Sequence, residues 1–173
     1  MEAKMQPETY QRVAMVAAAV YIIDRITKLL VMHLLGYADQ YVVLDGFFKF
    51  VHWGNTGAAW SMFYGNNGLL AFISVLALIV LLFTARDFDM RPLLARLAFG
   101  LIIGGILGNL TDRIRFGHVV DFIRFYLYQR GGDEIGFPAF NVADAAICIG
   151  VFFLLIVGRR HAAKSAPAGS TLN

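Results

Sequence analysis

Hydrophobic residues are grouped along the chain into four long stretches, separated by segments that are more polar. The stretches cover about residues 13–35, 69–85, 95–113 and 138–158. A helix that crosses a membrane needs about 20 mostly apolar residues, with a range of about 17–25, so each stretch is long enough. The backbone of a segment in lipid must satisfy its own hydrogen bonds, so the pattern predicts four transmembrane helices. The stretches do not alternate between polar and apolar residues, which argues against a membrane β-barrel.

The composition supports a membrane protein. The chain has 173 residues, of which 58% are hydrophobic and 16% are charged, and its mean hydropathy is +0.63. An average soluble domain has roughly 45–50% apolar and about 25% charged residues. These values exclude a disordered chain, a coiled coil and an ordinary soluble enzyme. We therefore predict an all-α membrane protein with one domain over residues 1–161 and a disordered tail over residues 162–173.

The distribution of Lys and Arg predicts the orientation in the membrane. Four spans place both termini on one side, together with the loop between the second and third spans. Eight Lys and Arg residues lie in segments 1–12, 86–96 and 159–173, whereas five lie in segments 36–68 and 113–136. The side that is richer in Lys and Arg is expected to be cytoplasmic. Loops 36–68 and 114–137 therefore face outward, and the net charge of +3 gives no reason to expect a nucleic-acid partner.

The first stretch has a second interpretation, which is a cleaved signal peptide with a small-residue site at Ala17-Ala18-Ala19. However, the hydrophobic pattern resumes after Asp24 and continues to Leu35. This continuation favours a helix that is retained in the mature protein.

Several local patterns refine the predicted architecture. The third stretch has glycines at positions 100, 104 and 108, a spacing that lets a neighbouring helix approach closely, and Gly117 is expected to end this helix. In the first outer loop, Tyr41–Leu44, Asp45-Gly46 and Phe47–Trp53 read as strand, tight turn and strand. The aromatic segment from Val119 to Arg130 is expected to form a short interfacial helix or a strand.

Three acidic residues lie at similar depths in three different predicted helices. At about 1.5 Å per residue, Asp24, Asp112 and Asp144 lie roughly 18, 24 and 22 Å from the cytoplasmic ends of their helices. The hydrocarbon core is about 30 Å thick, so all three fall in its outer half. A charge inside a membrane costs at least about 2.5–3.5 kcal/mol, and function is the default interpretation for Asp144, which is alone in an apolar helix.

A fourth acid, Asp121, follows Gly117 in an apolar setting and can reach the outer end of the helix that carries Asp144. Two carboxylates that approach each other can share one proton and act as an aspartic dyad, with one as base and the other as acid. The alternative is an ion site in a small transporter or channel subunit. Asp24 with Lys28, and Asp112 with Arg113, could also be simple ion pairs.

Other chemistries fit the sequence less well. The four His residues are scattered at positions 33, 52, 118 and 161, and no HExxH motif is present, so we expect no zinc site. No Gly-x-Ser-x-Gly motif is present. Cys148 lies in an apolar stretch and is expected to be a packing residue, because a single Cys forms no internal disulfide.

Five sequence blocks closely resemble those of the lipoprotein signal peptidase (signal peptidase II) family, and they occur in the family's order. They are Asp24-Arg25-Ile26-Thr27-Lys28, Asn55-Thr56-Gly57-Ala58-Ala59, Gly108-Asn109-Leu110-Thr111-Asp112-Arg113, Gly117-His118-Val119-Val120-Asp121-Phe122 and Phe140-Asn141-Val142-Ala143-Asp144. The resemblance covers residues 24–150. Two departures from the family pattern are mild: Arg25 stands where Gln is common, and Trp60 stands where Phe is common.

This resemblance implies roles for ten residues. Asp121 and Asp144 match the catalytic aspartates of the family. Asn55, Gly57, Asn109, Arg113 and Asn141 match residues that bind substrate or line the same pocket. Asp24, Lys28 and Asp112 match structural polar positions near the site. The family fold adds a small periplasmic β cradle and a short periplasmic helix to the four-helix bundle.

The resemblance also implies an activity and a location. The family comprises aspartic endopeptidases of the bacterial inner membrane, which use no cofactor or metal. They cut prolipoproteins before a Cys that carries diacylglycerol, and cyclic peptide antibiotics of the globomycin type inhibit them. We therefore expect a monomer that contacts membrane lipid, with both termini cytoplasmic and the active site near the periplasmic face.

Overall fold

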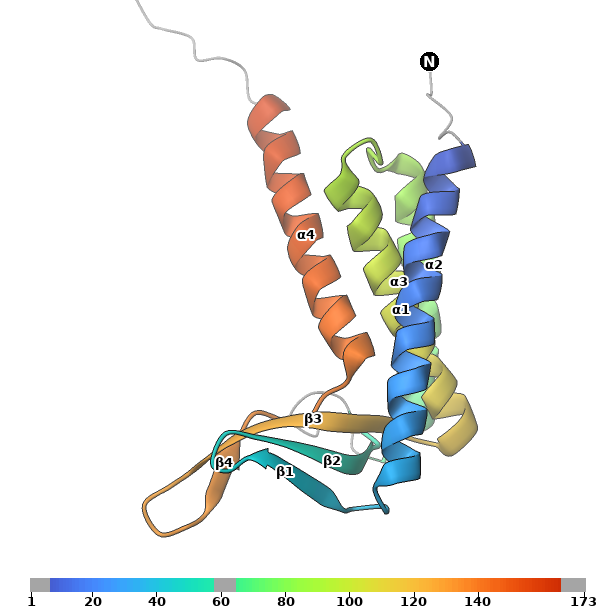
Figure 1. The fold of residues 1–173 in the computed structure, drawn as a ribbon. Helices are drawn as coiled ribbons and strands as arrows, with labels where there is room; N and C mark the ends of the chain where they lie inside the picture. The colour runs from blue at the N-terminus through green and yellow to red at the C-terminus, as the bar shows by residue number, and fades with distance from the viewer. Residues whose placement is uncertain (1–6, 58–64, 166–173) are drawn as a thin grey trace, which may run out of the picture.

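The computed structural model describes residues 7–57 and 65–165, and within these residues it contains four helices and four strands. The helices are α1 (Pro7–Leu34), α2 (Asn67–Asp87), α3 (Leu93–Phe116) and α4 (Val142–Ser165). The strands are β1 (Gln40–Leu44), β2 (Phe48–Asn55), β3 (Val119–Tyr128) and β4 (Glu134–Gly136). The helices lie side by side, and the sheet crosses one end of them, opposite the start of α1 and the end of α4 (Figure 1).

Helix α3 is the central helix of the bundle, as its glycine spacing predicts, because it packs against α1, α2 and α4. The glycines allow this close packing. A Cβ atom at Gly104 would lie 2.6 Å from the Ala17 carbonyl oxygen of α1. A Cβ atom at Gly105 would lie 2.5 Å from the Ala143 carbonyl oxygen of α4. Neither distance leaves room for a side chain, so glycine at these positions lets α1 and α4 pack closely on two neighbouring faces of α3.

Three of the helices in the described part of the chain are long and apolar enough to cross a membrane: α2, α3 and α4. Large apolar side chains such as Phe72 (65% exposed) and Phe83 (59% exposed) point outward from α2, as is expected of a helix surrounded by lipid. Helix α1 is long, but Asp24, Arg25 and Lys28 interrupt its apolar sequence, and all three side chains are buried against the other helices.

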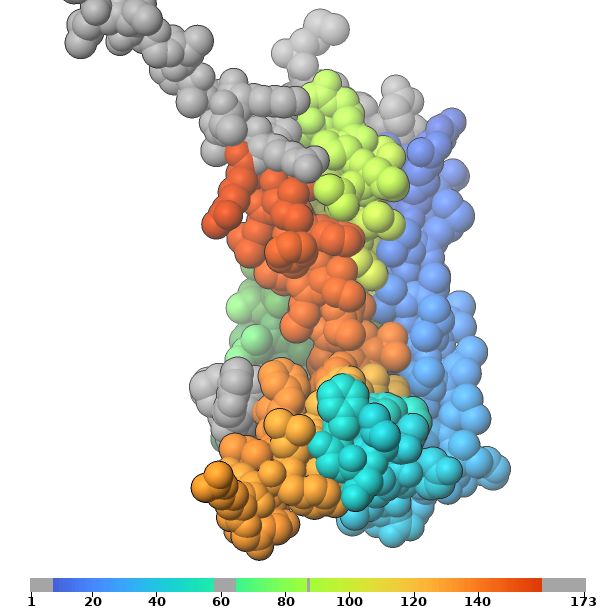
Figure 2. All heavy atoms as spheres, turned by 60° about the vertical axis from the view of Figure 1, so that its left-hand side comes forward, coloured from blue at the N-terminus to red at the C-terminus, as the bar shows by residue number. Residues whose placement is uncertain are grey.

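The two outer loops combine into one antiparallel sheet with the strand order β1-β2-β3-β4. Figure 2 shows the atoms of both loops gathered at one end of the helices. The predicted hairpin between β1 and β2 is confirmed, with Tyr41 opposite Phe50. The aromatic segment after Gly117 forms strand β3, in which Val119 pairs with Asn55 and Phe125 with Phe48. The term all-α is therefore too narrow, because strands from two distant loops pair through backbone hydrogen bonds.

The helix ends differ from the predicted spans in ways that have local causes. Helix α3 ends at Gly117, which has φ +75° and thus adopts the left-handed conformation that was expected there. Helix α4 begins at Val142 rather than near residue 138, because Phe140 is still paired with Ile123 of β3. It then continues to Ser165, four residues into the predicted tail. Residues 166–173 and 58–64 lie outside the described residues, and the described part contains no short helix in either outer loop.

Candidate active site

Strand β3 carries Asp121 to the end of the helix bundle that the sheet crosses, where the residue is 3% exposed. Its backbone is held by pairing with Trp53 of β2. Two amide side chains donate hydrogen bonds to the carboxylate. Asn55 Nδ2 lies 2.9 Å from Asp121 Oδ2, and Asn141 Nδ2 lies 2.8 Å from Asp121 Oδ1. Residues from β2, β3 and the segment before α4 therefore meet at this carboxylate.

Asp144 lies in the first turn of α4 and is part of the helix N-terminal cap. Asn141 Oδ1 accepts a hydrogen bond from the Asp144 backbone N–H at 2.9 Å, and Asp144 Oδ2 accepts one from the Asn141 backbone N–H at 3.2 Å. This reciprocal pair is a capping box, with Asp in place of the more common Glu. Asn109 Nδ2 of α3 donates a third hydrogen bond, to Asp144 Oδ1, at 2.7 Å.

Asn141 connects the two acids. Its side-chain oxygen is held by the backbone of Asp144, so its amino group must point the other way, toward Asp121 Oδ1 and the Val120 carbonyl oxygen at 3.3 Å. Asn141 thus contacts both carboxyl groups, that of Asp121 through its side chain and that of Asp144 through its backbone N–H, although the two acids are 23 positions apart in the sequence. The structure brings Asp121 and Asp144 to a single polar pocket.

The surroundings of Asp121 favour its protonated form. Burial, together with the nearby Asp144 carboxylate, raises the pKa of Asp121 to about 7 from its ordinary value of 3.8. The hydrogen bonds from Asn55 and Asn141 oppose this shift because they stabilise the charged form. A carboxyl group with a pKa near neutrality is suited to proton transfer at physiological pH.

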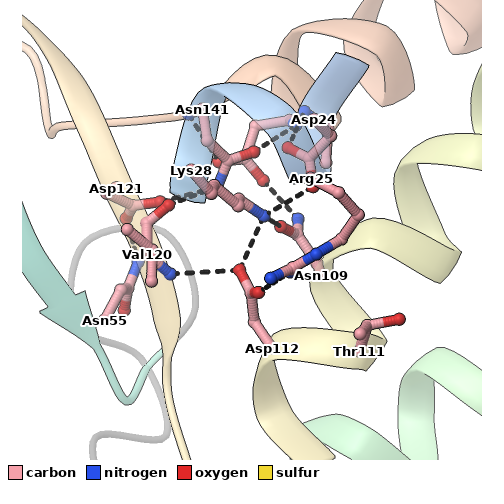
Figure 3. Close-up of polar contacts among 12 residues, drawn as sticks. Asp24, Arg25, Lys28, Asn55, Asn109, Thr111, Asp112, Val120, Asp121 and Asn141 are labelled. Carbon is pink, nitrogen blue, oxygen red and sulfur yellow. Dashed lines mark hydrogen bonds and ion pairs between the residues drawn. The ribbon is translucent and has the colours of Figure 1, made fainter. Parts of the chain in front are cut away.

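A buried ion network supports this pocket from the side of α1 (Figure 3). Lys28 Nζ lies 2.9 Å from Asp24 Oδ2 and 2.7 Å from Asp112 Oδ2, and all three side chains are fully buried. Arg25 Nη1 also contacts Asp112 Oδ1. The two pairs leave the cluster with no net charge, which satisfies the requirement that buried charges be paired.

The same network holds the backbone on both sides of the dyad. Asp112 Oδ2 accepts a hydrogen bond from the Val120 N–H at 3.2 Å, one residue before Asp121. Asp24 Oδ1 accepts one from the Ala143 N–H at 3.0 Å, one residue before Asp144. The carboxylates of Asp24 and Asp112 therefore position the strand and the helix that carry the two candidate catalytic acids.

Arg113 provides a polar group beside the two acids. Its Nη2 atom donates a hydrogen bond to the Gly57 carbonyl oxygen at 3.2 Å. Gly57 is itself held by a hydrogen bond from its N–H to Asn55 Oδ1 at 2.9 Å. The buried Nε and Nη1 atoms of Arg113 have no hydrogen-bond partner among the described residues, so they can donate to a bound molecule.

All ten site residues that were singled out in the sequence lie in this pocket or in the ion network beside it. The ion pair between Asp24 and Lys28 that the sequence suggested is present, but Lys28 also contacts Asp112 and Asn109. The considered pair between Asp112 and Arg113 is not among the ion pairs of the described residues, because Asp112 points toward α1 and pairs with Arg25 and Lys28. The structural role of Arg25 was missed, although its position beside Asp24 in an apolar helix was a signal for a buried partner.

No cluster of three or more His, Cys, Asp or Glu residues in residues 7–57 and 65–165 is arranged to hold a metal ion. The chemistry that the pocket itself offers is proton transfer between two carboxyl groups, together with hydrogen-bond donors for a developing negative charge.

Comparison with known proteins gives one family. The profile described as "Signal peptidase (SPase) II" matches residues 16–158. Several curated relatives are named lipoprotein signal peptidase. The one from Syntrophotalea carbinolica is 35% identical over 92% of this chain and 100% of its own length. The one from Geobacter sulfurreducens is 37% identical over 94% of this chain and 100% of its own length. The relative from Nitratidesulfovibrio vulgaris is 41% identical over 88% of this chain and 92% of its own length.

Two solved bacterial membrane enzymes share the fold. The first superposes with a TM-score of 0.79 at 28% sequence identity and covers 98% of both chains. The second has a TM-score of 0.71 at 30% identity and covers 91% of this chain and 96% of its own. The helices and the outer sheet are therefore similar to those of membrane enzymes over nearly the whole chain.

Proposed function

Because this chain belongs to the signal peptidase II family of aspartic proteases, we propose that it removes the signal peptide from prolipoproteins whose Cys carries diacylglycerol. The bond that it cuts is the one just before this Cys. Asp121 and Asp144 form the catalytic dyad and activate one water molecule. The observation that carries this proposal is the contact of Asn141 with both carboxyl groups at the outer end of the bundle.

The reaction needs one ionised and one protonated carboxyl group. The ionised group takes a proton from water, and the resulting hydroxide attacks the carbonyl carbon of the scissile peptide bond. The free N–H groups of Arg113 donate to the developing oxyanion. The protonated carboxyl group then gives its proton to the departing amide nitrogen, and a proton transfer between the two acids restores the starting state.

The proposed substrate fits the position of the pocket in the fold. A signal peptide with an acylated Cys is itself embedded in the membrane, so its scissile bond lies near the interface between lipid and water. The two acids belong to β3 and to the first turn of α4, where the helices meet the sheet, at the end opposite the start of α1 and the end of α4 (Figure 1). We place this end at the periplasmic face of the inner membrane, with α1 as a fourth span and both termini in the cytoplasm.

The direct test is cleavage of a lipid-modified prolipoprotein by the purified native protein in detergent or liposomes. We expect release of the signal peptide from the diacylglyceryl-modified substrate and no cleavage of the same precursor with its Cys replaced by Ala. Cleavage is expected to continue after addition of a metal chelator and to stop with an antibiotic of the globomycin type. Ion flux into liposomes without proteolysis would contradict the proposal and support the transporter alternative.

The rate of cleavage is expected to fall as the pH rises above about 7, because the dyad then loses the proton that it must donate to the departing amide nitrogen. Asn55→Ala removes a hydrogen-bond donor that stabilises the charged form of Asp121, so this substitution raises the pKa of Asp121 further. The alkaline limb of the pH profile should therefore move up by about 1 pH unit, since a hydrogen bond to a charged group contributes about 1.5–3 kcal/mol and one pKa unit is about 1.4 kcal/mol. Measurement of kcat/KM from pH 5 to 10 checks this. A limb that stays in place or moves down would contradict the role of Asn55.

A further inference from the structure

A chain of polar contacts runs from Lys28 in α1 to Asn109 in α3, both labelled in Figure 3, and from Asn109 to Asp144 in α4. Lys28 Nζ lies 2.9 Å from Asn109 Oδ1, in addition to its contacts with Asp24 and Asp112. An ammonium group has three N–H donors and no acceptor. The two ion pairs and the hydrogen bond to Asn109 hold the ammonium group from three sides.

Lys28 determines how the amide group of Asn109 is oriented. Because the ammonium can only donate, it requires the carbonyl oxygen of Asn109 on its side. The amino group of Asn109 must then face Asp144 Oδ1, which lies 2.7 Å away. An amino group can only donate, so this oxygen of Asp144 has to accept a hydrogen bond and cannot carry its proton toward Asn109.

The second oxygen of Asp144 also accepts a hydrogen bond, from the backbone N–H of Asn141 at the start of α4. The N-terminus of a helix carries a partial positive charge that favours a carboxylate over a neutral carboxyl group. Lys28 is the cation of the neutral ion network that contacts Asn109, so its positive charge lies one amide away from Asp144. Hydrogen bonds and charge thus act in the same direction at this residue.

Asp121 has different surroundings. Its two hydrogen bonds come from the neutral side chains of Asn55 and Asn141. It lies in a strand rather than at a helix N-terminus, and neither of the side chains that donate to it is hydrogen-bonded to Lys28. The charged form of Asp121 is therefore less stabilised than that of Asp144.

We propose that Lys28 is a positioning residue which, through the amide of Asn109, keeps Asp144 as the ionised member of the dyad. Asp144 is then the general base that takes a proton from water, and Asp121 is the acid that protonates the departing amide nitrogen. This inference rests on the proposed peptidase function and divides the two roles that the proposed function leaves open.

The charged and titratable groups that surround Asp144 come from three elements. Helix α1 contributes Asp24, Arg25 and Lys28, helix α3 contributes Asp112 and Arg113, and strand β3 contributes Asp121. The test therefore has to change Lys28 without leaving an unpaired buried carboxylate. Asp24→Asn provides this background, because the amide oxygen can still accept the hydrogen bond from Ala143 and the charge of Lys28 is no longer needed for neutrality.

Three variants separate the hydrogen bond from the charge: Asp24→Asn alone, Asp24→Asn with Lys28→Gln, and Asp24→Asn with Lys28→Met. Gln is neutral but can still donate a hydrogen bond to Asn109 Oδ1. Met is also neutral and cannot donate one. Each is assayed with a diacylglyceryl-modified prolipoprotein for kcat, KM and the pH profile, and its folding is checked by thermal unfolding in detergent.

We expect the Met variant to have about a 100-fold lower kcat than the Asp24→Asn protein, with KM changed less than threefold. The Gln variant should keep kcat within about tenfold of the Asp24→Asn protein, because the amide of Asn109 stays oriented. In both variants the acidic limb of the pH profile should move to higher pH, because the positive charge that favours ionisation of the base Asp144 is gone.

The inference is overturned if the Met variant matches the Asp24→Asn protein in kcat and pH profile, or if only KM rises. Should the Met variant fail to fold, the Gln variant decides alone, and an unchanged acidic limb rejects the role of the charge. The native protein and Asp144→Asn are assayed in parallel. If the native protein does not cleave, the proposed function fails; if it cleaves and the Lys28 variants match their control, only this inference fails.

Discussion

Asp144→Asn is expected to abolish cleavage of a lipid-modified prolipoprotein while leaving the protein folded. Asn has nearly the same size as Asp and can still accept a hydrogen bond from the start of α4, but it cannot take a proton from water at neutral pH. General acid–base catalysis contributes about 10²–10⁴-fold, and the dyad acts as a unit, so kcat should fall by about 1,000-fold or more. Single-turnover cleavage of a radiolabelled or fluorescent precursor measures this loss.

The matched control is Asp45→Asn, which makes the same chemical change in the turn between β1 and β2. Asp45 accepts hydrogen bonds from the hydroxyl groups of Tyr126 and Tyr128, and Asn can accept them as well. This variant should keep cleavage within about twofold of the native rate. A folded Asp144→Asn protein with normal activity would rule out the dyad, and so would equal losses in both variants.

Asp112→Ala is expected to have the largest effect on stability. Asp112 is fully buried, pairs with Lys28 and Arg25, and accepts the N–H of Val120. Its loss leaves two buried cations with a single remaining carboxylate, that of Asp24. Removal of one partner from a buried ion pair costs about 3–5 kcal/mol, so the free energy of unfolding in detergent should fall by this amount.

Two further variants identify the cause of such a loss. Asp112→Asn keeps an acceptor for Val120 but removes the charge, so its stability should lie between those of the native protein and Asp112→Ala. Thr111→Ala changes the adjacent residue, whose hydroxyl bonds the Leu107 carbonyl of its own helix, and should cost less than about 1 kcal/mol. A loss below 1 kcal/mol in Asp112→Ala would show that the ion network is not needed for stability.

The helices could be predicted from the sequence because hydrophobic stretches and glycine spacing act locally. The hairpin and the helix end at Gly117 follow from equally local signals. The joining of the two outer loops into one sheet could not be predicted this way, because the pairing of Asn55 with Val119 depends on contacts between segments 64 positions apart. The start of α4 was misplaced for the same reason, since the pairing of Phe140 with Ile123 extends the loop.

The acids of the site could be found in the sequence because charges are rare in apolar helices. Their partners were harder to assign. A pair four residues apart, such as Asp24 and Lys28, is visible in one helix, whereas the contact of Asp112 with Arg25 depends on how α1 and α3 pack. The orientation of each amide, which decides what Asn109 and Asn141 offer to the acids, becomes known only when both of its neighbours are in place.

The pairing of β2 with β3 has a consequence for chimeric proteins made from members of this family. The side chain of Asn55 in β2 donates a hydrogen bond to Asp121 in β3, so each of the two outer loops has to fit the other for this contact to form. A graft that exchanges only one loop would combine strands whose side chains did not evolve as partners. Functional exchange of substrate preference between relatives should therefore require both loops to be transplanted at once.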